Sequence, residues 1–177
     1  MERPLDRIRS LIREVPDFPT PGVSFKDITP LLRDPSGLAL AVELMANPFR
    51  GKNIEVVVGA ESRGFIFGIA VAQTLSAGFI PIRKPGKLPA EKFGVDYALE
   101  YGVDRLEMHR DAIVKDQRVL VVDDLLATGG TMKASIDLIE HLGGAIVGVS
   151  VLIELAFLNG RERLGPRGES VHAVLAY

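Results

Sequence analysis

The chain has 177 residues, 47% hydrophobic and 25% charged, which is enough for one globular domain with a substantial core. Its 21 Lys and Arg nearly balance its 23 Asp and Glu, which argues against a broad basic surface for nucleic acid, and the lack of Cys excludes disulfides and thiolate chemistry. Because no apolar run approaches the roughly 20 residues of a membrane span and the first residues lack an apolar signal segment, we expect a soluble, cytoplasmic protein.

The first 50 residues predict two helices separated by a stiff loop. Apolar residues at helical spacing between Leu5 and Ile12 indicate a short amphipathic helix, which Val15-Pro16 ends. Residues 16–28 contain three prolines and a glycine, so we expect no regular element there, only a loop that carries two phenylalanines. A second helix begins at Pro35-Ser36 and ends near Asn47-Pro48.

A strand followed by a polar corner comes next. Ile54–Val58 is an apolar strand, Gly59–Gly64 is the corner, and an apolar helix runs from about Phe65 to Leu75. Loops at the carboxyl ends of strands bind ligands in open α/β sheets. A cation in such a loop suits an anion, which makes Arg63 a candidate ligand.

The segment after the next strand has the composition of a mobile flap. The strand is Phe79–Ile82, and the following Arg83–Pro89 contains three cations, two prolines and a glycine. Tyr97–Gly102 then alternates like a strand, with Arg105–His109 as its hairpin partner. Residues 90–95 fit no motif and are assigned no chemistry.

The stretch Val119–Thr131, VLVVDDLLATGGT, contains the strongest signal in the chain. Four apolar residues predict a buried strand that ends in Asp123-Asp124, and a turn with two glycines leads into a helix. Backbone N–H groups in such a turn, the helix dipole and the threonine hydroxyls favour a phosphate. Since carboxylates repel a phosphate, the acid pair should face sugar hydroxyls or a magnesium ion that the ligand brings.

The remaining elements complete an alternating pattern. After the helix that ends at Gly143-Gly144 come the strand Ala145–Glu154, a tail at residues 160–164 and a last strand near Val171–Leu175. Alternating strands and helices predict an α/β fold, a mostly parallel sheet with helices on both faces. We expect a single domain over residues 1–177.

Several motifs resemble those of a known family. The acid pair with TGGT, behind four apolar residues, resembles the phosphoribosyl pyrophosphate (PRPP) signature of the type I phosphoribosyltransferases. PDFPTPG-x-x-F-K-D from Pro16, RKxGKLP from Arg83 and LEYG from Leu99 resemble segments of the adenine phosphoribosyltransferases. The GxxxxGK[ST] and GxGxxG patterns are absent, which argues against ATP and NAD.

The resemblance implies a type I phosphoribosyltransferase fold with a small N-terminal hood (about 16–34), a flexible hairpin flap (about 83–109) and a role for each motif. Glu100, Arg63 and Lys87 would be catalytic, with Glu100 facing N7 of adenine. Asp123 and Asp124 would bind the ribose, and the 5′-phosphate would bind Ala127, Thr128, Gly129, Gly130 and Thr131. The pyrophosphate would contact Glu61, Ser62, Arg63, Arg83, Lys84 and Lys87. Phe25 would stack on adenine, with Ser24, Lys26 and Leu125 as further contacts.

The implied reaction is purine salvage, the transfer of phosphoribosyl from PRPP to adenine to give AMP and pyrophosphate. It implies Mg²⁺ carried by PRPP rather than held in a dedicated metal site, and a homodimer that needs neither nucleic acid nor membrane. Two alternatives stay open: a sister enzyme for hypoxanthine, guanine or xanthine, and a regulator that senses PRPP without turnover. The net charge of −2 argues against the nucleic-acid-binding face that such a regulator needs.

Overall fold

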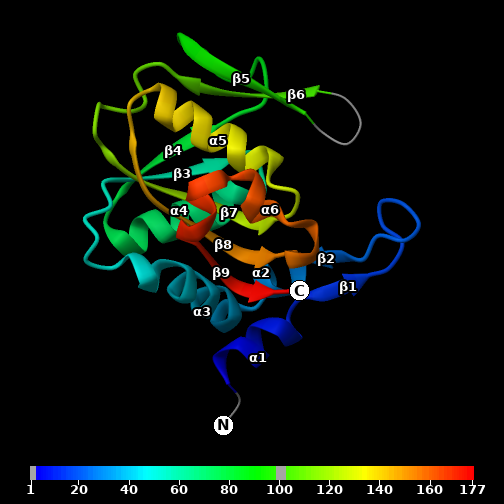
Figure 1. Ribbon diagram of the computed structural model, residues 1–177. Coiled ribbons are helices and arrows are strands. Elements are labelled where there is room, and N and C mark those ends of the chain that lie inside the picture. The colour runs from blue at the N-terminus through cyan, green and yellow to red at the C-terminus, as the bar shows by residue number, and fades with distance from the viewer. Residues whose placement is uncertain (1–2, 99–102) are drawn as a thin grey trace.

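The protein is built around a five-stranded parallel sheet (Figure 1). The computed structural model describes residues 3–98 and 103–177. In spatial order the strands of this sheet are β4 (Gly78–Ile82), β3 (Val56–Ala60), β7 (Arg118–Leu126), β8 (Ala145–Glu154) and β9 (Val171–Ala176). All neighbouring pairs are parallel. Their carboxyl ends therefore share one edge, the position at which such sheets bind ligands.

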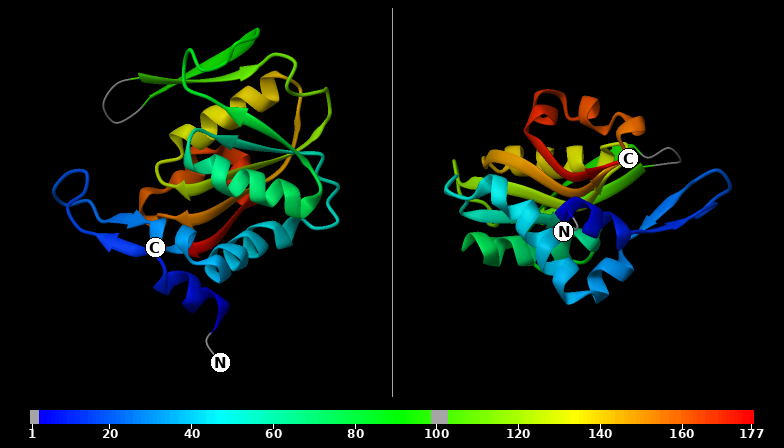
Figure 2. Two further views of the ribbon diagram at one scale, coloured as in Figure 1. Left: turned by 180° about the vertical axis from the view of Figure 1, so that it is seen from behind. Right: turned by 90° about the horizontal axis from the view of Figure 1, so that it is seen from below.

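Helices cover both faces of the sheet (Figure 2). On one face, a buried apolar cluster joins the strands to α1 (Pro4–Ser10), α2 (Thr29–Arg33), α3 (Pro35–Ala46) and α4 (Arg63–Leu75). On the other face, a second cluster joins them to α5 (Gly130–His141) and to a hairpin of β5 (Lys92–Ala98) and β6 (Val103–His109). Short helices complete the chain: η1 (Asn47–Phe49), η2 (Ala156–Leu158), α6 (Gly160–Arg163) and η3 (Gly165–Ser170). The predicted α/β fold is confirmed.

Within the described residues, no helix has the length and apolar character needed to cross a membrane.

Strand β7 is longer than the sequence pattern predicted. It continues beyond Val122 to Leu126, so that the acid pair lies inside the strand rather than after it. The extension exists because Leu125 and Leu126 go on pairing with Ile153 and Glu154 of β8. The backbone that carries the acid pair is therefore held by sheet hydrogen bonding.

The N-terminal loop also contains a strand, contrary to the expectation that it has no regular element. Phe25–Asp27 forms β2, which pairs antiparallel with β1 (Arg13–Val15). The three prolines and Gly22 all precede β2, so none of them interrupts the pairing, and Arg13 Nε donates to Asp27 at 2.9 Å. The hood thus has a hairpin that fixes the backbone on either side of Lys26.

The second hairpin begins earlier than expected. The prediction placed its first strand at Tyr97, but β5 begins at Lys92, whose partner is His109. The ring of Phe93 stacks on His141 of α5 at 3.5 Å between centroids, and this packing explains a strand where the sequence showed no motif. Backbone hydrogen bonds of 2.9 and 2.8 Å between Arg83 and Glu107 tie the hairpin to the end of β4.

Candidate active site

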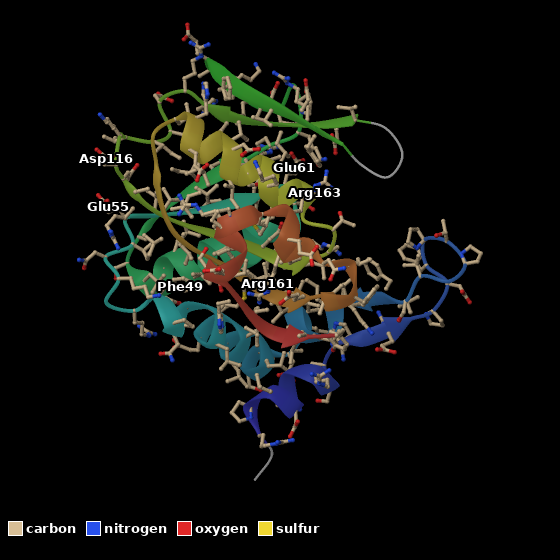
Figure 3. The ribbon with its side chains drawn as sticks, in the orientation of Figure 1. Phe49, Glu55, Glu61, Asp116, Arg161 and Arg163 are labelled. Atoms are coloured by element: carbon tan, nitrogen blue, oxygen red, sulfur yellow. The ribbon has the colours of Figure 1, made fainter. Side chains whose placement is uncertain are left out.

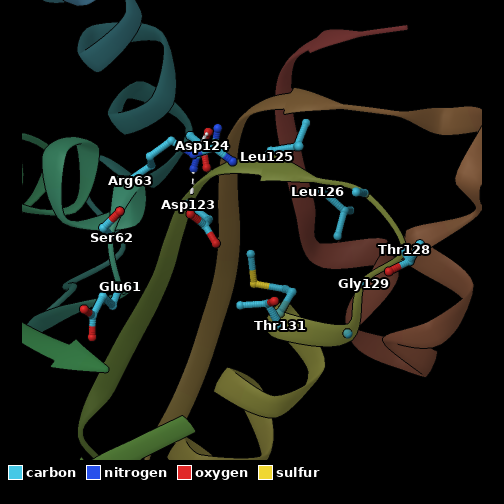
Figure 4. Close-up of a pocket in the computed structure, with 13 residues that line it drawn as sticks. Glu61, Ser62, Arg63, Asp123, Asp124, Leu125, Leu126, Thr128, Gly129 and Thr131 are labelled. Carbon is cyan, nitrogen blue, oxygen red and sulfur yellow. Dashed lines mark hydrogen bonds and ion pairs between the residues drawn. The ribbon is translucent and has the colours of Figure 1, made fainter. Parts of the chain in front are cut away.

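A cavity of about 220 Å³ lies at the carboxyl edge of the sheet (Figure 4). Its walls come from two places in the chain that are about 60 residues apart: residues 61–63 after β3, and residues 123–132 at the end of β7 and the start of α5. These positions meet because β3 and β7 are neighbouring parallel strands. The structure therefore brings together the acid pair, the glycine turn and the corner that carries Arg63, all predicted as site residues.

The glycine turn can curl because of the conformation of Gly129. This residue has φ +82°, which residues with a side chain rarely adopt, and it immediately precedes α5. The helix then begins with Gly130, Thr131 and Met132, and the Lys133 N–H donates to the Gly129 carbonyl at 2.8 Å. The free N–H groups of the first turn of α5 consequently adjoin the cavity, which is the arrangement that binds phosphate.

The acid pair lies in a low-dielectric environment. Burial, followed by the charge of Asp124, holds the pKa of Asp123 well above its ordinary value. Burial also raises the pKa of Asp124, while the Arg63 guanidinium opposes that shift. Arg63 Nε lies 3.0 Å from Asp124 Oδ2, and the Asp124 side chain is only 7% exposed. Arg63 thus serves as the counter-ion of Asp124.

Glu61 connects the cavity to the segment after β4. Its carboxylate accepts hydrogen bonds from the Lys84 backbone N–H at 2.9 Å and from Arg83 Nε at 3.0 Å. The backbone hydrogen bond first, and the Arg83 hydrogen bond second, lower the pKa of Glu61. Three predicted pyrophosphate residues are therefore joined by hydrogen bonds, because Arg83 and Lys84 both donate to Glu61.

The side chains of the two predicted pyrophosphate lysines lie in different surroundings. Lys84 Nζ contacts Asp104 of β6 and lies 3.2 Å from the Tyr97 hydroxyl of β5. The Lys84 hydrogen bond is the main reason that the pKa of Asp104 is lowered. Lys87 is exposed. In this conformation the Lys84 ammonium group thus bonds to the β5–β6 hairpin, and Lys87 faces solvent.

The hood lies next to the cavity through Phe25. The Arg63 guanidinium carbon is 5.6 Å from the centre of the Phe25 ring, and Phe18 packs edge-on against the same ring at 5.2 Å. Ser24 is exposed, whereas the Lys26 side chain is 9% exposed and pairs with Glu14. Lys26 can therefore offer a ligand its backbone but not its ammonium group. Leu125 is half-buried and lines the cavity itself.

Some residues that support the site carry no functional signal in the sequence. Asp104 and Tyr97 engage Lys84, and Gly160 contacts the glycine turn from behind. An apolar–polar alternation predicted the hairpin, but no pattern in the sequence pairs Asp104 with Lys84, twenty residues away. Glu100, the predicted proton-transfer residue, lies outside the described residues.

The comparisons with known proteins agree with this geometry. Residues 29–171 match the family model of the phosphoribosyl transferase domain. An adenine phosphoribosyltransferase from Koribacter versatilis is 56% identical over 97% of this chain and 93% of that relative. One from Methylococcus capsulatus is 52% identical over 98% of this chain and all of that relative.

Solved structures give the same result. Adenine phosphoribosyltransferase from Rhodothermus marinus superposes with a TM-score of 0.92 at 52% identity, covering 98% of both chains. The Saccharomyces cerevisiae enzyme, solved with adenine and an imino-altritol bisphosphate, has a TM-score of 0.91 at 35% identity, covering 97% of this chain and 98% of that one. This chain therefore belongs to the phosphoribosyl transferase family and, within it, to the adenine phosphoribosyltransferases.

Proposed function

We propose that this protein transfers the phosphoribosyl group of PRPP to adenine, giving AMP and pyrophosphate in purine salvage. The observation that carries the proposal is the cavity in which the acid pair and the glycine turn form one wall and Arg63 forms another, with Phe25 beside Arg63. A phosphate site and a ribose site in one cavity, next to an aromatic ring, suit a phosphorylated sugar and a base.

The PRPP end of the site uses two kinds of group. The N–H groups of Gly129, Gly130 and Thr131, with the hydroxyls of Thr128 and Thr131, hold the 5′-phosphate beside Ala127. Asp123 and Asp124 accept hydrogen bonds from the ribose hydroxyls, since two carboxylates in a cavity repel a phosphate but suit hydroxyl donors. Fixing both ends of the sugar orients its anomeric carbon.

The base stacks on Phe25, whose ring is half-buried at the hood. Backbone groups of Ser24 and Lys26 read the edge of the base, which agrees with a Lys26 side chain that points away to Glu14. Leu125 adds an apolar contact inside the cavity. Backbone recognition of this kind depends on the β1–β2 hairpin holding its shape.

In the reaction, the bond between the anomeric carbon and pyrophosphate breaks and a bond to a ring nitrogen of adenine forms. Positive charge grows on the ribose while negative charge collects on the leaving group. The cations Arg63, Arg83, Lys84 and Lys87 balance the latter, once Lys84 leaves Asp104, and the Ser62 hydroxyl donates a hydrogen bond to the leaving group. Glu100 accepts the proton that adenine loses as the new bond forms. The 83–109 flap excludes water, which would otherwise hydrolyse the sugar.

Magnesium fits this site as a metal that the substrate carries. Asp123 and Asp124 present carboxylate oxygens to the cavity, the donor type that Mg²⁺ prefers. Across residues 3–98 and 103–177, no group of three or more His, Cys, Asp or Glu side chains is arranged to hold a metal ion. When bound, the ion would balance negative charge on the pyrophosphate.

We also propose that the protein works as a cytoplasmic homodimer. Ile66 and Ile69 are 43% and 47% exposed on the outer side of α4, and paired apolar residues on one helix suit burial against a second copy. A chain without cysteine is compatible with the cytoplasm. Sedimentation of the purified protein should give twice the chain mass, and Ile66→Lys with Ile69→Lys should give the single mass.

The decisive experiment supplies PRPP and Mg²⁺ with adenine, hypoxanthine, guanine or xanthine in turn, and detects nucleoside monophosphates by chromatography. We expect AMP from adenine and little product from the other bases. Asp123→Asn with Asp124→Asn should lose the activity, whereas Asp111→Asn, an exposed loop aspartate, is the matched control. Product from another base in place of AMP would favour a sister enzyme, and no product from any base would favour a PRPP sensor.

A further inference from the structure

The glycine turn is supported from behind by a segment that follows η2. An ideal Cβ on Gly160 would lie 2.2 Å from the carbonyl oxygen of Ala127, and one on Gly129 would lie 2.6 Å from the carbonyl oxygen of Gly160. Real Cβ atoms essentially never make non-bonded contacts so close, so the two backbones touch with no room for a side chain at either position. The shape of the turn therefore depends on where Gly160 is held.

Arg161, the next residue, is anchored to the sheet. Its Nε and Nη2 donate to the two carboxylate oxygens of Glu154, each at 2.7 Å, and its Nη1 donates to the carbonyls of Val171 at 2.8 Å and Gly168 at 3.2 Å. The Glu154 side chain is only 10% exposed. A two-pronged ion pair with such a buried carboxylate fixes both position and orientation. Figure 3 shows Arg161 where α6 meets the sheet.

Glu154 is itself fixed relative to the turn. It is the last residue of β8 and pairs with Leu126, the last residue of β7, and the Leu155 N–H donates to the Leu126 carbonyl at 2.9 Å. The turn begins at the next residue, Ala127. Together these contacts hold Gly160 against Ala127 and Gly129: the ends of β7 and β8 are paired, and the Glu154–Arg161 ion pair joins the residue after Gly160 to the end of β8.

We propose that Arg161, held by Glu154, is a positioning residue for the 5′-phosphate: it keeps Gly160 against the turn so that the N–H groups of residues 129–131 converge on the phosphate. This role rests on the proposed function, because it assigns the turn to the 5′-phosphate. Arg161 acts through the backbone of the turn and does not itself bind the ligand. Its loss should therefore lower the affinity for ligands with a 5′-phosphate. The affinity for adenine, which binds at the hood, should not change.

The test compares Arg161→Ala, Arg161→Lys and Gly160→Ala with the wild type by titration calorimetry and kinetics. We expect Arg161→Ala to bind ribose 5-phosphate and AMP at least 10-fold more weakly and to raise the KM for PRPP, with the KM for adenine at saturating PRPP unchanged. Arg161→Lys should recover part of the loss. Gly160→Ala should reproduce it with Arg161 intact, because the added methyl pushes on Ala127.

Arg167→Ala is the matched control. Arg167 also bonds a carboxylate and a carbonyl, but its partners are Glu140, near the far end of α5, and Ile146, near the start of β8. Its removal should leave phosphate affinity unchanged. Melting temperatures of all variants separate a loss of fold from a loss of phosphate binding.

Wild-type affinity for ribose 5-phosphate in both Arg161→Ala and Gly160→Ala would overturn the proposal, as would an equal loss for adenine or a failure of every variant to fold. The wild type separates this result from the proposed function. A wild type that binds ribose 5-phosphate but makes no AMP contradicts the proposed function alone. A wild type that binds no 5′-phosphate ligand contradicts both.

Discussion

Replacing Asp123 with Asn should stabilise the protein and lower its affinity for PRPP. The pKa of Asp123 is raised well above its ordinary value, first by burial and then by the charge of Asp124. A carboxyl with a raised pKa stays protonated to a higher pH in the folded chain than in the unfolded chain. Stability therefore falls as pH rises from the ordinary pKa of the carboxyl to its raised pKa in the folded chain. Once Asp123 is ionised, its buried charge costs stability, and Asn removes that charge.

The magnitudes follow from the surroundings of the side chain. Asp123 Oδ1 accepts from the Asp124 N–H at 2.9 Å, a hydrogen bond that an Asn oxygen can keep. Single stabilising substitutions typically contribute about 0.5–2 kcal/mol, which for a chain of this size raises Tm by about 1–8 °C. A hydrogen bond to a charged group contributes about 1.5–3 kcal/mol, so PRPP affinity should fall roughly 10- to 160-fold.

Urea unfolding between pH 4 and pH 8 and calorimetric titration with PRPP measure the two effects. The stability gain of Asp123→Asn should grow as pH rises and then level off, because only the wild type gains the buried charge. Asp137→Asn, on the surface of α5, should show neither effect. A destabilised Asp123→Asn at neutral pH, or one with wild-type PRPP affinity, would refute the reasoning.

Three other substitutions test the rest of the site. Glu100→Leu should lower kcat by about 10²- to 10⁴-fold through the loss of proton transfer with unchanged PRPP affinity in calorimetry, and an unchanged kcat would remove Glu100 from the mechanism. Phe25→Ala should raise the KM for adenine because stacking on a base contributes about 1–3 kcal/mol; Phe157→Ala, an exposed phenylalanine, is the control, and an equal change in both would contradict the stacking role. Asp104→Asn should free Lys84 and tighten pyrophosphate binding about 2- to 5-fold, the scale of a partly exposed ion pair; unchanged affinity in titration would show that the contact with Asp104 does not compete with pyrophosphate.

Sequence periodicity and turn chemistry predicted the elements that the parallel sheet contains. The strands β3, β8 and β9, the first part of β7 and helix α5 lie where the apolar patterns placed them, because buried strands and amphipathic helices each have a local signature. The sequence failed at β2 and at the start of β5. Each of those strands depends on a partner, β1 or β6, and on packing such as that of Phe93 on His141, which no short stretch encodes.

By itself, the sequence determined the chemistry of the glycine turn and the acid pair, because each of these features is contained in a few consecutive residues. Only the tertiary structure decided their partners. Arg63 lies against Asp124 and Phe25 because parallel pairing brings β3 beside β7, and Gly160 reaches the turn because Arg161 bonds Glu154 at the end of β8. Contacts between residues far apart in the chain follow from sheet order and register, which local patterns do not specify.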